Sequence, residues 1–166
     1  ADFYFAGWQY GFSEADVTPA KLAGFDVKSY ALYESCIRIG PRPPISMETM
    51  YADVSALGRI FGVMAEAEAL IAGYRSRVTA VVDRTAKAST RPRIMYCGGC
   101  NTDSPPRTIG TEGMPRLLFD LAGGRNVYDD IKDSYVNVSW DTVIDRAPEW
   151  IVISNRASRT RTASPT

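Results

Sequence analysis

Residues 63–88, VMAEAEALIAGYRSRVTAVVDRTAKA, form the stretch of sequence that decides the fold. Apolar residues recur here at steps of three and four, which is the spacing of one stripe along a helix. They are Met64, Ala67, Leu70, Ile71, Tyr74, Val78, Val81 and Val82. An unbroken helix over this range would be about 39 Å long at about 1.5 Å per residue, longer than most globular helices. The pattern predicts a bridge between two lobes or, alternatively, a long surface helix of a single α/β domain.

Short strands and short helices alternate on both sides of this helix. Strands are predicted over about 2–6, 27–32, 93–97 and 150–154 from their apolar and aromatic content. Capping residues and helix-ending glycines or prolines predict helices after Thr18, Ser46, Thr111 and Ser139 that end near Gly24, Gly62, Gly123 and Pro148. This alternation favours parallel sheets, in which ligands lie beyond the carboxyl ends of the strands.

The composition indicates a globular chain without a nucleic-acid partner. The 166 residues are 45% hydrophobic, and 19 basic side chains are balanced by 19 acidic ones, so there is no basic surface for a duplex. No run reaches the roughly 18 apolar residues of a membrane span, and any export signal would lie upstream or have been removed. The polar, Arg-rich residues 156–166 are predicted to be a disordered tail.

Histidine is absent, which excludes Ser-His-Asp and Cys-His sites and lowers the expectation of an enzyme. Cys97-Gly-Gly-Cys100 follows an apolar strand and is compatible with a redox pair or half of a zinc site. Zinc is disfavoured because Cys36 is the only further cysteine. Two prolines in the following loop argue against a thioredoxin-like helix, so a structural role is favoured. In an exported protein, pairing of one of these cysteines with Cys36 is an alternative that would leave an odd thiol.

Aromatic residues gather at the predicted carboxyl ends of the strands. The first strand leads to Trp8 and Tyr10, the second to Tyr33, and the strand after the long helix to Tyr96. Such a cluster, with few charges, suits a bulky and partly apolar ligand. The alternative is that Trp8 and Tyr10 only cover a hydrophobic edge.

Four segments carry a resemblance to a known family. They are DFYFAGW (2–8), SALGRIFG (55–62), DLAGGRNV (120–127) and VSWDTVIDRAPEWIVI (138–153). In this order around a long helix, they resemble the substrate-binding proteins of ABC importers for cobalamin and ferric siderophores, the class III periplasmic binding proteins. The resemblance implies an α/β fold of two Rossmann-like lobes with parallel sheets, joined by one backbone helix, with ligand held in the cleft between the lobes.

The resemblance also implies a division of the chain. Residues 1–62 would be part of the N-terminal lobe, 63–88 the inter-lobe helix, and 89–155 part of the C-terminal lobe. Both lobes are then expected to be incomplete at the chain ends. The Cys-Gly-Gly-Cys segment is not a general feature of the family, so the resemblance says nothing of its role.

Particular residues match the family's sites. Trp8 matches an aromatic residue that contacts ligand in the cobalamin binders, and Tyr135 a second one on the other lobe. Further ligand contacts are expected from Tyr10, Tyr33, Tyr96 and Arg107, and the planar guanidinium of Arg107 suits a ligand carboxylate or phosphate.

The resemblance implies a partner and a location as well. Glu14 and Asp141 match the acidic residues, one on each lobe, through which such proteins dock on their permease. Both residues would equally suit the N-terminus of a helix. The expected protein is extracytoplasmic, periplasmic or held by an upstream lipid anchor, without catalytic residues, metal or cofactor of its own. It would deliver an iron-siderophore, haem or corrinoid ligand to an ABC permease.

Two other classes of function stay open at this point. One is a redox or metal-binding enzyme domain that uses Cys97 and Cys100. The other is a cell-surface interaction module with the same fold and no role in transport.

Overall fold

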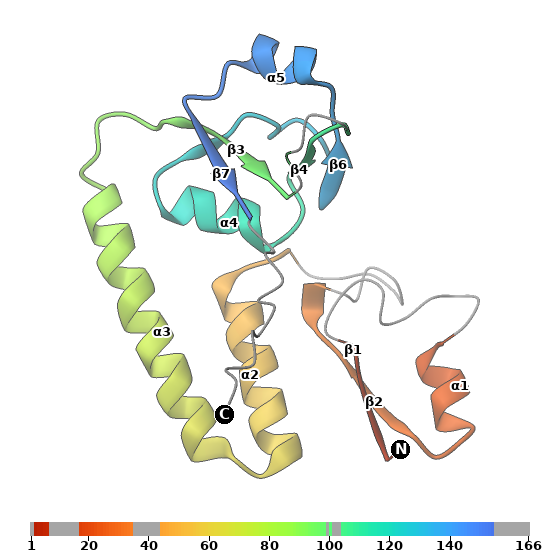
Figure 1. Cartoon of the computed structure of the whole chain (residues 1–166). Helices are drawn as coiled ribbons and strands as arrows, with labels where there is room; N and C mark the ends of the chain where they lie inside the picture. Colours follow the sequence, from red (N-terminus) through yellow and green to blue (C-terminus); the bar gives the residue numbers. More distant parts are fainter. Residues whose placement is uncertain (1, 7–16, 35–43, 99, 101–103, 155–166) are drawn as a thin grey trace, which may run out of the picture. The chain divides into compact units, whose positions relative to one another are not determined.

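The computed structural model of the chain describes residues 2–6, 17–34, 44–98, 100 and 104–154 (Figure 1). The chain separates into two compact units, which are described in turn. The first unit comprises Ala1–Ala88 with Leu121–Gly123, and the second comprises Ser89–Asp120 with Gly124–Thr166.

The first unit contains a pair of parallel strands and three helices. In chain order these are β1 (Phe3–Ala6), α1 (Pro19–Ala23), β2 (Lys28–Ala31), α2 (Met47–Phe61) and α3 (Met64–Thr85). The predicted caps are confirmed, because the hydroxyl of Thr18 accepts a hydrogen bond from Lys21 N and that of Ser46 accepts one from Thr49 N. β1 and β2 pair in parallel, as the alternation of elements predicts.

The helices α2 and α3 pack side by side as a hairpin (Figure 1). Gly62 makes the turn between them with φ of 70°, a left-handed conformation that favours glycine. The long helix has 22 residues and is shorter than predicted at both ends. At its C-terminus Lys87 N and Ala88 N donate to carbonyls three residues back, so the chain leaves the α-helix in a tight turn.

Part of the apolar stripe of α3 faces solvent in this unit. Ala67 is its one buried residue among those described, whereas Leu70 and Val81 are 48% and 39% exposed. Arg75 of α3 binds both carboxylate oxygens of Glu48 on α2 and lies 4.4 Å from the ring centroid of Tyr51. The role of α3 as a bridge between lobes stays a prediction.

Replacement by alanine is expected to have opposite effects on stability at two glycines of this hairpin. A Cβ on Gly58 of α2 would lie 2.6 Å from Cβ of Ala67, whereas a Cβ on Gly73 of α3 meets nothing within 4 Å. Gly73→Ala is therefore expected to raise the free energy of unfolding by about 0.5–1 kcal/mol. Gly58→Ala is expected to lower it, by up to about 3 kcal/mol from overpacking. Urea unfolding of both variants checks this, and equal stabilisation would contradict the close approach of the two helices.

The second unit is built around β3. Its elements are β3 (Arg93–Cys97), β4 (Arg107–Ile109), α4 (Met114–Leu121), β5 (Arg125–Asn126), β6 (Tyr135–Asn137), α5 (Trp140–Arg146) and β7 (Trp150–Ile153). β3 lies between β5 and β7 in a parallel sheet, which confirms the predicted pairing mode. β4 and β6 form a separate antiparallel pair that the sequence did not predict.

A small apolar core supports this unit. Met95 and Cys97 of β3 pack with Tyr128 and with Val143 of α5. β7, in contrast, is an edge strand, and its four apolar side chains are all exposed in the part of the chain that the structure describes.

One predicted cap is wrong. The hydroxyl of Thr111 donates to the carbonyl of Ile131, and α4 begins only at Met114. Ser139, in contrast, caps α5 as predicted, because its hydroxyl accepts from Thr142 N.

An ion pair beside this core predicts acid sensitivity. Arg146 donates to both carboxylate oxygens of Asp130, at 2.6 and 2.8 Å, and this holds the pKa of Asp130 down to about 2. Since the pKa is lowered on folding, the pair stabilises the protein above the ordinary value of 3.8 and ceases to do so as pH falls toward about 2.

Thermal unfolding between pH 5 and pH 2 tests this acid sensitivity. Asp130→Asn is expected to remove part of the fall in melting temperature over that window. Asp145→Asn, in no ion pair among the described residues, is the control. Identical pH profiles for the wild type and Asp130→Asn would contradict the prediction.

Candidate functional site

Three residues predicted to contact ligand lie together in the second unit. Tyr96 comes from β3, Arg107 from β4 and Tyr135 from β6. The rings of Tyr96 and Tyr135 meet edge to face with their centroids 6.1 Å apart, and Cζ of Arg107 lies 5.1 Å from the centroid of Tyr135. We call these three residues the aromatic–arginine cluster.

Strand pairing explains why residues so distant in sequence meet. β4 and β6 are antiparallel with Ile109 opposite Tyr135 and Arg107 opposite Asn137. Side chains two positions away on a facing strand remain within reach of long residues, so Arg107 can lie over the ring of Tyr135. β3 contacts β4, and this brings Tyr96 to the same place.

The cluster presents a cation on an aromatic surface. The side chain of Arg107 is exposed and forms no ion pair among the described residues, whereas Tyr96 and Tyr135 are half-buried. A guanidinium held over a ring keeps donors for a carboxylate or phosphate. Beside it, the tyrosine rings offer apolar surface with polar tips. The arrangement suits a large ligand that is partly aromatic or apolar and carries an anionic group.

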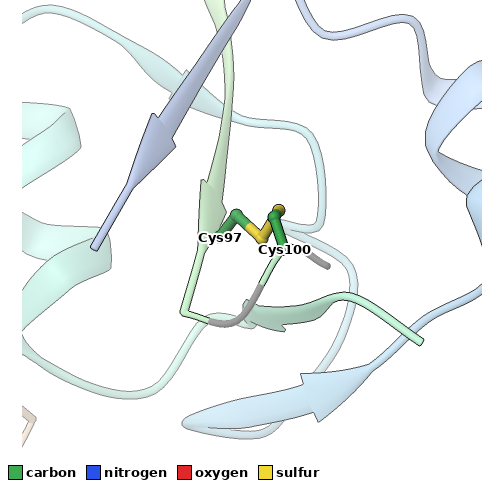
Figure 2. Close-up of a disulfide and its surroundings, with 2 residues drawn as sticks. All are labelled: Cys97 and Cys100. Atoms are coloured by element: carbon green, nitrogen blue, oxygen red, sulfur yellow. A yellow bond between two sulfur atoms is a disulfide. The ribbon is translucent and has the colours of Figure 1, made fainter. Parts of the chain in front are cut away.

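A disulfide joins Cys97, the residue that follows Tyr96, to Cys100 (Figure 2). Their Cα atoms are 5.8 Å apart, a separation that disulfides ordinarily span. This pairing replaces the alternative in which one of the two bonds to Cys36, which lies outside the described residues. Because both sulfurs are consumed in the bond, neither is a thiolate available to zinc.

Tyr33 lies in the first unit, where a buried carboxylate fixes its backbone. Its N–H donates to both oxygens of Asp53, at 3.3 and 3.2 Å, and the hydroxyl of Tyr30 donates to the same carboxylate at 2.7 Å. Burial raises the pKa of Asp53 above its ordinary value, and these hydrogen bonds offset part of the rise. Sequence analysis missed Asp53, since an acidic residue between Tyr51 and Val54 carries no signal that separates it from a solvent-facing one.

Removal of this carboxylate should loosen the segment that carries Tyr33. Asp53→Ala is expected to lower the free energy of unfolding by about 1–3 kcal/mol, because it removes the buried carboxylate that accepts from two part-buried donors, the hydroxyl of Tyr30 and the N–H of Tyr33. Asp83→Ala, at an exposed position of α3, is the control and should change stability by less than about 0.5 kcal/mol. Chemical denaturation of both variants measures the difference, and equal stabilities would refute the structural role of Asp53.

Of the remaining predicted residues, the structure describes Asp141. Asp141 is exposed in the first turn of α5. Trp8, Tyr10 and Glu14 lie outside the described residues. Within the described ranges, no group of three or more cysteine or acidic side chains is arranged to hold a metal ion, and no helix is long and apolar enough to cross a membrane.

Comparison with known proteins identifies relatives of the chain. A family model described as periplasmic binding protein matches residues 30–164. A cobalamin-binding protein of Halobacterium salinarum is 30% identical over 122 residues, which are 71% of this chain and 31% of that protein.

Solved structures share the fold. One, titled an ABC-type Fe3+-hydroxamate transport system from Saccharomonospora viridis, superposes with a TM-score of 0.72 at 21% identity, over 92% of this chain and 49% of that one. The periplasmic vitamin B12 binding protein of Vibrio cholerae gives 0.70 at 20% identity, over 94% and 55%.

The chain therefore spans about half the length of these structures and about a third of the curated relative. The matched family, the Halobacterium relative and the Vibrio structure are binding proteins, not enzymes, which confirms the expectation of a binding protein and disfavours the redox-enzyme alternative.

Proposed function

Because the chain belongs to the periplasmic binding protein family, as its sequence motifs predict, we propose that it serves an ABC importer as an extracytoplasmic solute-binding protein. Its ligand in this proposal is a ferric siderophore, a haem or a corrinoid. The aromatic–arginine cluster supplies part of the ligand-binding surface, together with Trp8, Tyr10 and Tyr33.

The single observation that carries this proposal is the meeting of Tyr96, Arg107 and Tyr135 in one place. The sequence alone predicts each of the three as a ligand contact, and the three lie side by side in the structure. Tyrosine rings stack on conjugated or apolar surface, and the exposed guanidinium of Arg107 pairs with an anionic group. Corrinoids, haems and many iron chelates combine extended surface with carboxylate, phosphate or hydroxamate groups.

The names of the relatives support the same class of ligand. One relative is a cobalamin-binding protein, one neighbour binds vitamin B12, and another belongs to a hydroxamate-iron transport system. These relatives differ in ligand, so they support a class of large chelates and not one compound.

The proposal includes a permease as the partner. Glu14 and Asp141 would each meet a basic residue of the permease, and Asp141 is exposed at the start of α5 as such a contact requires. In this account the chain meets the membrane only through the permease or an upstream lipid anchor.

Mass spectrometry of compounds that co-purify with the full-length protein tests the ligand class. The proposal predicts a bound tetrapyrrole, corrinoid or ferric chelate after release in organic solvent. A gene neighbourhood with a permease and an ATPase would support import, whereas a co-purified peptide or simple sugar would contradict the proposed ligand.

A further inference from the structure

We propose that the disulfide between Cys97 and Cys100 fixes the aromatic–arginine cluster in position and that reduction of this bond releases it. We call this redox control the lock. In the oxidised protein the disulfide holds the backbone of Cys97 and Gly98, which we call the turn, and with it Tyr96 and Arg107 in position. Reduction by a dithiol releases the turn, displaces the two side chains and weakens ligand binding. The displacement of the cluster side chains does not depend on the proposed function. Only the predicted loss of ligand affinity rests on the proposed function.

Gly98, between the two cysteines, connects the turn to the cluster. Its N–H donates to the carbonyl of Arg107 at 2.8 Å. The position that a Cβ on Gly98 would occupy lies only 3.1 Å from Cε1 of Tyr96 and 3.6 Å from the Arg107 carbonyl oxygen. The backbone of the turn is therefore packed against the ring of one cluster residue and hydrogen-bonded to the main chain of another.

The third member of the cluster links these two. Tyr96 meets the ring of Tyr135 at an edge, and Arg107 lies over the same ring. A shift of the turn that displaces Tyr96 or Arg107 consequently changes what surrounds Tyr135 as well. The surroundings of all three side chains are therefore expected to change together when the disulfide is reduced.

The two sulfur atoms differ in solvent exposure, and this determines which of them the reductant attacks. Cys97 is 0% exposed, whereas Cys100 keeps part of its surface exposed. A thiolate of the dithiol attacks Sγ of Cys100, the S–S bond breaks, and the Cys97 sulfur leaves and takes up a proton. The second thiol of the reductant then resolves the mixed disulfide and releases Cys100 as a thiol. Two electrons and two protons pass to the protein, and the dithiol becomes a disulfide.

Reduction is expected to move the turn and to leave the core and the sheet of this unit in place. Cys97 is packed with Met95, Tyr128 and Val143, and a thiol occupies this apolar site as a small hydrophobic side chain does. Backbone hydrogen bonds fix the strand that carries Cys97, including the one from Ser154 N to Cys97 O. Loss of the bond to Cys100 should thus leave the core and the sheet in place.

NMR of the arginine side chains and tyrosine rings tests the lock without any ligand. The experiment uses the chain with Cys36→Ser, so that dithiothreitol acts on one disulfide alone. Reduction, verified by a mass increase of two hydrogens, is expected to shift the Arg107 guanidinium and Tyr135 ring signals. A pair of the same chemistry in the first unit should not move, namely Arg75 over Tyr51, 4.4 Å from ring centroid to guanidinium carbon.

Unchanged Arg107 and Tyr135 signals in the reduced protein would overturn the proposal. Equal shifts of the Arg75 and Tyr51 signals would also overturn it, because the change would then not be confined to the surroundings of the disulfide. Cys100→Ser provides a second route at a partly exposed position, and it should reproduce the reduced spectrum without reductant.

Titration of both redox states with cyanocobalamin, haemin and ferrichrome, a ferric hydroxamate siderophore, tests the effect on binding. For a probe that binds, affinity is expected to fall at least about fivefold on reduction, the lower end of typical coupling between linked sites. Equal affinities would overturn control of binding. If no probe binds the oxidised protein, the proposed function fails for these ligands and the NMR result alone decides the lock.

Discussion

Replacement of Arg107 or Tyr135 by alanine is expected to weaken ligand binding about tenfold, and replacement of both by less than about a hundredfold, because the two side chains are in contact. In the proposed site Arg107 would supply the charge for an anionic group of the ligand, and Tyr135, whose ring lies beneath the guanidinium, would supply aromatic surface. Each tenfold loss corresponds to about 1.4 kcal/mol, an ordinary contribution for an aromatic or arginine contact at a binding site. Equilibrium titration with the ligand that co-purifies with the wild type measures the effect.

The matched control for this series is Arg125→Ala. Arg125 is in the same unit and pairs with Asp129 at 3.1 Å, but it is not part of the aromatic–arginine cluster. Its variant should bind ligand as the wild type does. If Arg107→Ala and Arg125→Ala bind equally well, the cluster is not the ligand site, provided that thermal unfolding shows both variants to be folded.

Transport should depend on two residues that ligand binding does not need. The double variant Glu14→Ala, Asp141→Ala is expected to abolish uptake by cells that contain the permease, while the affinity for ligand stays within about twofold of the wild type. The physical reason is that each carboxylate would pair with a permease cation in the docked complex, and removing one partner leaves a buried charge unpaired.

Asp145→Ala is the control for docking, because Asp145 is exposed on the same helix as Asp141. Uptake assays with labelled ligand, paired with titration of the purified variants, separate transport from binding. Loss of ligand affinity in the double variant, or normal uptake, would refute the docking role.

Local chemistry explains which parts of the fold the sequence predicts well. The ends of α1, α2 and α5 follow from hydroxyl caps at Thr18, Ser46 and Ser139, and from the left-handed turn at Gly62. Each cap or turn is formed by residues only a few positions apart, so it can be predicted from the sequence without knowledge of the tertiary structure.

The strands that the sequence does not predict depend on pairing between residues far apart in the chain. β4, β5 and β6 have only two or three residues each, too few for any alternation to appear, and β4 and β6 exist because they pair with each other. The cluster depends on that pairing. Tyr96, Arg107 and Tyr135 could be selected singly as candidates, but nothing local indicates that their side chains meet.

The disulfide and Asp53 illustrate the same limit. Spacing alone left Cys97 free to pair with Cys36 or with Cys100, and only the turn after β3 brings the latter two together. Asp53 is buried because Tyr30 and Tyr33 converge on it from β2 and the turn that follows, contacts that the pattern of α2 does not contain.

The most direct test of the account is a fluorescence titration of the full-length oxidised protein with cyanocobalamin, haemin and ferric siderophores of the hydroxamate and catecholate classes. The account predicts saturable, one-to-one quenching of tryptophan or tyrosine emission by at least one of these ligands, and loss of that response in the Arg107→Ala, Tyr135→Ala variant. Absence of a response to every ligand, or an unchanged response in the double variant, would contradict it.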